Sequence, residues 1–488
     1  MNGITDRVLR GTVLVSLARI VVNILSMLST IVLAWFLVPA DFGLVAIAGT
    51  VIFVISVATE LSLSSALVRH KAPDESHLSA AFTLNAVRSL GISLFTGAIS
   101  WPIATFFGDQ RLVPIMWAFA GSLFIGGLVN PRMALAQRDL QFWQDSVVQI
   151  GQKLAGLIAS FAWAYAFRDY WALVAGSVAT QVSTVILSYA VLPFRPRILF
   201  RHFREFFGFS GWIMASQIVN TLNWRFDQFL VGKMFGASTL GTYNMGSNLA
   251  QIATREAILP LTKPLFPAFV AIREDKERLA AAYLRVQRIV SGIALPAGVG
   301  LTLVAEPLIA LFLGKEWEPS VPVFQAVAFI GGIQGLGMLV QPLAMAINQT
   351  RNLFQRDIMI LAMRLTALVA GALLMGVSGV IIGVVVTGLF TLLLNLMFVK
   401  RLIGLSISYQ ISANGRSLLG VSTMTLVLFW IDPLLAVDND WTGKAIRLVA
   451  LVGAGAVTYV TCVALAWRLQ GTPEGIEAEA LRIFRRYV

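Results

Sequence analysis

Long apolar runs separated by short polar connections extend along almost the whole chain. About 20 consecutive apolar residues suffice for a helix to cross a bilayer, and about fourteen runs reach that length. They cover 11–38, 42–67, 78–106, 112–131, 146–167, 171–193, 208–232, 239–270, 287–313, 319–347, 357–377, 379–399, 415–435 and 445–467. Only the pair Ser378-Gly379 divides two of these runs. The pattern predicts an all-α integral membrane protein with about 14 transmembrane helices.

The composition agrees with a chain whose solvent is the bilayer. Of 488 residues, 57% are hydrophobic and 13% are charged, whereas soluble proteins carry about 25% charged residues. The single cysteine, Cys462, lies in an apolar run and excludes a disulfide framework. The first run is predicted to be a span rather than a secretory signal, because it is long and Arg19 interrupts it.

Basic residues are concentrated in every second connection between the apolar runs. The connection 194–207 carries Arg195, Arg197, Arg201 and Arg204, whereas the connections on either side of it hold one basic residue each. This alternation follows the positive-inside rule. The net charge of +12 is therefore interpreted as topology and not as nucleic-acid binding, and both termini are predicted to be cytoplasmic.

Short matches between the two halves of the chain indicate an internal repeat. ARIVVNIL at 18–25 corresponds to ASQIVNTL at 215–222, and VPIMWA at 113–118 corresponds to VPVFQA at 321–326. The same comparison pairs Gly43 with Gly241. The repeat unit holds six spans, an even number, so both halves have the same orientation. A pseudo-twofold axis along the membrane normal follows.

The repeat predicts four parts of the chain. They are an N-terminal six-helix lobe at 1–193, a cytoplasmic basic linker at 194–207, a C-terminal six-helix lobe at 208–404, and two additional transmembrane helices with a cytoplasmic tail at 405–488. Two six-helix lobes that face each other enclose a central cavity, which is a transporter architecture. The alternative is an old duplication without a cavity.

Polar stripes within the apolar runs identify candidate site residues, since an ionisable group at membrane depth indicates a functional site. Three runs carry polar residues at steps of four, three and four, so that each set shares one helix face. The candidates for a substrate-binding cavity are Arg19, Asn23, Ser216, Asn220, Asn223, Asn244, Asn248, Gln251 and Arg255. The alternative for these stripes is hydrogen bonding between helices in a dry bundle.

Further embedded charges extend this set. Asp227, Arg225 and Glu256 are candidates for ion coupling or a charge pair, and Arg88, Lys153 and Arg364 are further cavity candidates. Basic groups outnumber acidic ones among the embedded residues, and a hydrated cationic cavity suits an anionic ligand.

Enzyme and cofactor motifs are missing from the sequence. It contains no G-x-x-x-x-G-K-[ST], no dinucleotide fingerprint, no H-E-x-x-H and no Cys/His metal cluster. We therefore predict a transporter that is not an enzyme, with no catalytic residue, no cofactor and no metal, driven by a gradient or by downhill substrate flux.

Several motifs resemble those of a known family. They are Arg195-Pro196, Phe207-Gly208, the pattern Asp227-x₄-Gly232-x₃-Gly236-x₃-Leu240-Gly241-x-Tyr243, and Phe266-Pro267-Ala268. The chain resembles the polysaccharide transporter family of Wzx-type oligosaccharide-lipid flippases. That family belongs to the multidrug, oligosaccharidyl-lipid and polysaccharide flippase superfamily. The likeness covers nearly the whole chain, and Asp227 matches the family's acidic position.

The resemblance implies a function in the bacterial inner membrane. Family members move undecaprenyl-pyrophosphate-linked repeat units to the periplasmic leaflet by alternating access, for exopolysaccharide, capsule or lipopolysaccharide synthesis. It also implies a pyrophosphate held by cationic cavity residues, contact with membrane lipid, an H⁺ or Na⁺ gradient, and polysaccharide polymerase and export machinery as partners. Arg19 and Arg255 match no family motif and rest on spacing alone.

Two other functions remain open on the sequence. One is a multidrug exporter or a peptidoglycan-precursor (lipid II) flippase of the same superfamily. The other is a membrane polysaccharide polymerase, which needs a long catalytic loop outside the membrane, whereas the longest such connection here, around 438–444, is short.

Overall fold

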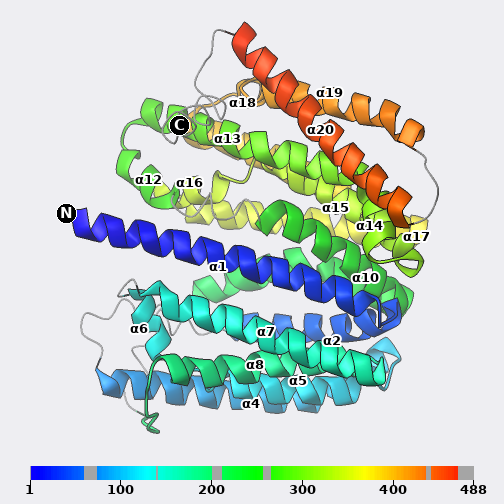
Figure 1. Cartoon of the computed structure of the whole chain (residues 1–488). Coiled ribbons are helices and arrows are strands. Elements are labelled where there is room, and N and C mark those ends of the chain that lie inside the picture. The colour runs from blue at the N-terminus through cyan, green and yellow to red at the C-terminus, as the bar shows by residue number, and fades with distance from the viewer. Residues whose placement is uncertain are drawn as a thin grey trace. The chain divides into compact units, whose positions relative to one another are not determined.

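The computed structural model describes the chain apart from residues 1, 60–73, 139–140, 201–210, 257–264, 436–440 and 471–488. Within the described ranges every regular element is a helix, as Figure 1 shows. The chain forms two compact units, Met1–Asn244 and Met245–Val488. The boundary between these units falls inside a helix, and the lobes 1–193 and 208–404 stay a prediction.

In the first unit the described residues form seven complete helices and most of an eighth. They are α1 (Asn2–Ala34), α2 (Pro39–Ala58), α4 (Glu75–Phe107), α5 (Leu112–Gly126), α6 (Arg132–Arg138), α7 (Phe142–Phe167), α8 (Trp171–Val191) and α10 (Gly211–Gln251). Helix α7 packs against α8 and α1, and α5 packs against α4, α8 and α2. Asp74 caps the start of α4 by accepting from the backbone N–H groups of Ser76 and His77. Hydrogen bonds from the Ser76 hydroxyl and from His77 hold the pKa of Asp74 well below its usual range.

The second unit contains the remaining helices. They are η1 (Ile252–Glu256), α12 (Leu265–Ile272), α13 (Lys276–Leu303), α14 (Ala305–Phe312), η2 (Lys315–Ser320), α15 (Val321–Gln334), α16 (Val340–Ala346), α17 (Thr350–Ile403), α18 (Ile407–Ser412), α19 (Gly415–Ile431), η3 (Asp432–Leu435) and α20 (Trp441–Leu469). Helix α13 packs against α15 and α19, and α19 packs against α20.

Nine helices in the described part of the chain are long and apolar enough to cross a membrane. The larger number of predicted spans has a structural reason. The predicted spans 287–313 and 319–347 are each divided between two helices, α13 with α14 and α15 with α16. Helix α5 has only 15 residues, and α17 covers two predicted spans. The prediction of an all-α membrane protein is confirmed, because the described parts of the predicted apolar runs lie mainly on helices.

Helix α17 is a hairpin of two spans. Its 54 residues would extend about 80 Å as one straight helix, far beyond the roughly 30 Å core of a bilayer. Gly376 breaks it with φ 63°, a left-handed conformation that favours glycine. Gly371 and Gly379 then face each other so closely that a Cβ on either would overlap the carbonyl of the other. The predicted division at Ser378-Gly379 is therefore correct to within two residues.

Helix boundaries repeat between the two units. Helix α5 ends at Gly126, and α6 and α7 begin at Arg132 and Phe142. Their counterparts α15, α16 and α17 have the same three boundaries 208 residues later. The matched sequences VPIMWA and VPVFQA thus lie on corresponding helices. The predicted rotation axis between the halves stays a prediction.

Candidate functional site

A close helix crossing in the first unit positions the candidate site. Helix α10 bends at Gly236, where φ is 82°, so its two arms run back along each other. The second arm meets α2 at Gly241 and Gly43. A Cβ on Gly43 would overlap the carbonyl oxygen of Ala237, and a Cβ on Gly241 would overlap that of Pro39. The contact is reciprocal, since each glycine faces the residue four positions before the other.

A polar network begins at Gln228, on the first arm of α10. Its side-chain oxygen accepts from the Thr50 hydroxyl of α2 at 3.2 Å and from Nη1 of Arg225 at 2.8 Å. Its amide nitrogen donates to Oδ1 of Asn244, on the second arm, at 3.0 Å. Gln228 is buried, so these bonds compensate for the cost of removing its amide from water. The network therefore joins α2 to both arms of α10.

Asp227 and Tyr243 form a second link between the arms. The Tyr243 hydroxyl donates to Oδ2 of Asp227 at 2.7 Å, and both side chains are buried. A hydrogen bond to a charged acceptor is stronger than one between neutral groups. The predicted role of Asp227 in ion coupling or a charge pair stays a prediction. This hydrogen bond joins it to a hydroxyl of the other arm.

Arg225 lies half-buried beside this pair. Its guanidinium carbon sits 4.8 Å from the ring centroid of Phe53 on α2, a cation–π contact, and one of its N–H groups donates to Gln228. Arginine keeps its charge at any relevant pH, and its planar fork matches phosphate oxygens. The network thus holds a fixed positive charge among amides and a hydroxyl.

Several other candidate residues lie outside this network. Arg88 of α4 donates to Oδ1 of Asn85 on the same helix at 3.3 Å and to the Ser56 carbonyl of α2 at 3.4 Å. The second contact joins α4 to α2. Asn220 is exposed and accepts from Nε1 of Trp224 at 3.1 Å. The partly buried candidates are Arg19 and Asn23 on α1, Lys153 on α7, Asn223 on α10 and Arg364 on α17.

The predicted stripe of the eighth span changes character along its length. Asn248 is exposed, and Gln251 donates to the Ser247 hydroxyl at 2.9 Å. Residues Ile252–Glu256 then form a π-helix, which has wider turns and is frequent at functional sites. The α-helical spacing that placed Arg255 in the stripe therefore does not extend to it. The side chains of Arg255, Glu256 and Ser216 lie outside the described residues.

Four residues of the network are not among the predicted site residues. Gln228 lacks a charge and fits no stripe. Thr50 and Phe53 share one face of the second span with Ala46 and Val57 at the spacing of a stripe, but this face is mostly apolar and gave no polar candidate. Tyr243 had a usable signal, because it closes the motif that begins at Asp227 and has Gly236 near its middle. A turn at Gly236 brings these two ends of the motif together.

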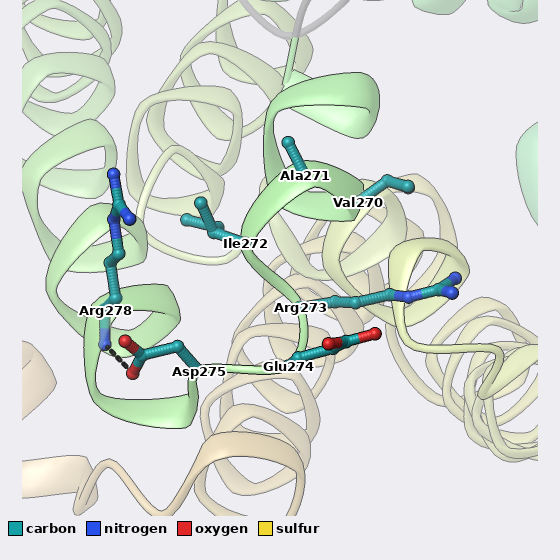
Figure 2. A pocket seen from close by; sticks show the side chains of 7 residues that line it. All are labelled: Val270, Ala271, Ile272, Arg273, Glu274, Asp275 and Arg278. Carbon is teal, nitrogen blue, oxygen red and sulfur yellow. Dashed lines mark hydrogen bonds between the residues drawn. The ribbon is translucent and has the colours of Figure 1, made fainter.

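The second unit has a cavity of about 330 Å³, shown in Figure 2. Its lining residues are Val270, Ala271, Ile272, Arg273, Glu274, Asp275 and Arg278. Asp275 caps α13 by accepting from the backbone N–H of Arg278 at 3.0 Å. No candidate residue of the predicted site lines this cavity, which lies in the connection between α12 and α13.

A family model and two curated relatives that match this chain are all polysaccharide biosynthesis proteins. The model of a family described as polysaccharide biosynthesis protein matches residues 32–322. The lipopolysaccharide biosynthesis protein WzxC of Escherichia coli K12 is 23% identical over 422 residues, covering 82% of each chain. The teichuronic acid biosynthesis protein TuaB of Bacillus subtilis is 23% identical over 420 residues, covering 84% of this chain and 86% of its own.

Solved structures show the same fold. The lipid II flippase MurJ in an inward closed conformation matches with a TM-score of 0.73 and 14% identity, covering 93% of this chain and 99% of its own. At this identity the likeness concerns the fold, which is that of an all-α membrane transporter.

Proposed function

This chain belongs to the polysaccharide biosynthesis protein family, and we propose that it is a flippase for undecaprenyl-pyrophosphate-linked oligosaccharide repeat units in the bacterial inner membrane. The match to WzxC, which extends over 82% of both chains, is the observation that carries the proposal. The transporter fold shared with MurJ supports movement of a lipid-linked substrate by alternating access. The product supplies exopolysaccharide, capsule or lipopolysaccharide synthesis.

The candidate residues give the proposal a chemical basis. The substrate head group is an anionic pyrophosphate, and arginine pairs bidentately with phosphate oxygens. Arg19, Arg225 and Arg255 are the proposed phosphate-binding groups, and the asparagines of the stripes bind sugar hydroxyls. Asp227 is the proposed site of coupling to H⁺ or Na⁺.

Deletion of the gene tests the function directly. We expect secreted polysaccharide to disappear and undecaprenyl-pyrophosphate-linked repeat units to accumulate with their sugars on the cytoplasmic side. Lipid extracts before and after glycosidase treatment of right-side-out and inverted vesicles measure this sidedness. Complete repeat units that reach the periplasmic leaflet without the protein contradict the proposal. Polymer of altered length with normal translocation indicates a polymerase.

A lipid II flippase is the second candidate, because MurJ shares the fold over 93% of this chain. Expression of this chain in cells depleted of their own lipid II flippase separates the two functions. Under the first proposal it does not restore growth. Restored growth, with unchanged polysaccharide after deletion, favours the second candidate.

A further inference from the structure

The segment 193–200 leaves α8 as an extended strap with two kinds of side chain. Phe194 and Leu199 are partly buried, and Phe194 packs against Leu78, Ala81 and Ala134 of the first unit. The remaining side chains of the strap are exposed. They include two arginines, Arg195 and Arg197, and two large apolar residues, Ile198 and Phe200, with exposures of 76% and 67%.

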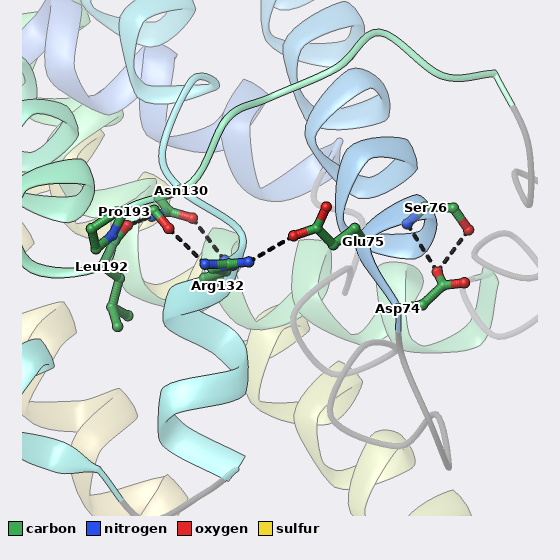
Figure 3. Close-up of polar contacts among 7 residues, drawn as sticks. All are labelled: Asp74, Glu75, Ser76, Asn130, Arg132, Leu192 and Pro193. Atoms are coloured by element: carbon green, nitrogen blue, oxygen red, sulfur yellow. Dashed lines mark hydrogen bonds and ion pairs between the residues drawn. The ribbon is translucent and has the colours of Figure 1, made fainter.

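Hydrogen bonds fix the strap to two helices of the same unit, α6 and α4. Arg132, at the start of α6, donates to the Pro193 carbonyl at 2.6 Å and to Glu75 of α4 at 3.0 Å (Figure 3). The Leu199 backbone N–H donates to the Thr83 hydroxyl of α4 at 2.9 Å. Both ends are therefore tied down, and the exposed side chains between them are held in a fixed place.

The length of α4 gives the depth of the strap in the membrane. Its 33 residues extend about 50 Å, which exceeds the hydrocarbon core by about 20 Å. If this excess is shared between its ends, about seven residues at each end lie outside the core. Thr83 is the ninth residue of α4, so Leu199 lies at the boundary between head groups and hydrocarbon.

We propose that the strap 193–200 is a binding element for anionic phospholipid head groups of the surrounding bilayer. At the boundary, Arg195 and Arg197 meet lipid phosphates, and Ile198 and Phe200 enter the outer part of the hydrocarbon. Basic residues next to a membrane attract anionic lipid, and neighbouring apolar side chains add buried area. This combination fits a bilayer better than a soluble protein partner, since the apolar residues lie at membrane depth. The proposal depends on the membrane location of the chain and not on its transported substrate.

Lipid titration of the purified full-length protein tests the binding. In neutral detergent, we expect phosphatidylglycerol to raise the melting temperature more than phosphatidylcholine with the same acyl chains. The variant R195Q/R197Q should need about thirty-fold more phosphatidylglycerol for half of the effect, because each juxtamembrane arginine contributes roughly fivefold. The matched control is R195K/R197K, which keeps both positive charges at the same positions and should respond like the parent. An equal response of R195Q/R197Q and the parent overturns the proposal, as does an equal effect of both lipids on the parent.

The depth of Ile198 provides an independent test. A nitroxide attached at I198C, in a C462S background, should be more accessible to oxygen than to a water-soluble nickel complex in vesicles that contain phosphatidylglycerol. The control is K400C, which should be accessible to the nickel complex. If the label at position 198 behaves like the control, the strap faces water and is available to a protein partner instead, and the proposal is wrong.

Discussion

Side chains along α10 differ in how firmly the fold holds them. Asp227, Gln228 and Tyr243 are buried and hydrogen-bonded across the hairpin, whereas Asn220 and Asn248 are exposed. The stripes defined by spacing treat Asp227, Asn220 and Asn248 alike and omit Gln228 and Tyr243. The bonded residues fit the alternative of helix-to-helix hydrogen bonding, and the exposed asparagines are better candidates for contact with a substrate.

Tyr243→Phe tests the structural role of the buried pair. The substitution removes the hydroxyl that donates to Asp227, and a hydrogen bond to a charged group contributes about 1.5–3 kcal/mol. We expect a lower melting temperature of the purified protein. Tyr409→Phe is the control. Tyr409 is exposed on α18, so this variant protein should melt at the same temperature as the parent. Equal melting of both variants contradicts the structural role.

Asp227→Asn separates coupling from structure. An asparagine can still accept the Tyr243 hydrogen bond, so most of the stability should remain, whereas a proton or sodium ion no longer has a carboxylate to bind. We therefore expect export to decrease by more than the melting temperature indicates. Polysaccharide secretion and detergent melting are the two measurements. Unchanged values of both show that the residue has neither role.

Arg19→Ala and Arg255→Ala test the predicted pyrophosphate contacts. Each contact should contribute about 1.5–3 kcal/mol, so its loss lowers substrate affinity roughly ten- to a hundredfold. Lysine should restore export poorly, because it lacks the bidentate fork. Lost export with unchanged melting supports the ligand role. Loss of export and stability together, or normal export, rejects it and favours an arginine that only joins neighbouring helices.

At the scale of elements, apolar runs predict helices well but not how the helices break. The run lengths gave the positions of the spans, and the division of α17 was placed within two residues of Gly376. The turn at Gly236 and the π-helix at Ile252–Glu256 were not predicted, because both depend on backbone conformations that hydropathy does not report. The missed link between Asp227 and Tyr243 follows from that turn.

Gly43→Ala should weaken the crossing of α2 and α10. The added methyl group would overlap the Ala237 carbonyl oxygen, and backbone cannot move aside as a flexible side chain can. Overpacking of this kind costs about 1–3 kcal/mol. We expect a clearly lower melting temperature and lower amounts of protein in the membrane.

Gly49→Ala is the matched control on the same helix. A Cβ at this position has nothing within 4 Å, and alanine favours a helix over glycine by about 1 kcal/mol. Gly49→Ala should therefore melt at the parent temperature or above it. If Gly43→Ala is as stable as Gly49→Ala, the close crossing does not exist in the protein.

At the scale of the whole molecule, the repeat connects sequence and structure. Residues 142 and 350 begin corresponding helices, and Gly43 and Gly241, which the repeat pairs, face each other. Weak matches of a few residues were enough to find this relation, because their order along the chain is preserved. The repeat also predicts the rotation axis between the halves, whereas the substrate depends on individual side chains that a repeat does not report.

The orientation of the molecule in the membrane is the remaining global prediction. Arginine and lysine alternate between the two sets of connections, which predicts cytoplasmic termini and a cytoplasmic 194–207 linker. In a C462S background, Arg201→Cys should be protected from a membrane-impermeant maleimide in intact spheroplasts and become reactive in inverted vesicles. Lys315→Cys, from the set of connections poor in basic residues, should show the opposite pattern. Labelling of Arg201→Cys from the periplasmic side would show that the topology is the reverse of the predicted one. The strap and the predicted cavity would then meet their ligands from the opposite side of the membrane.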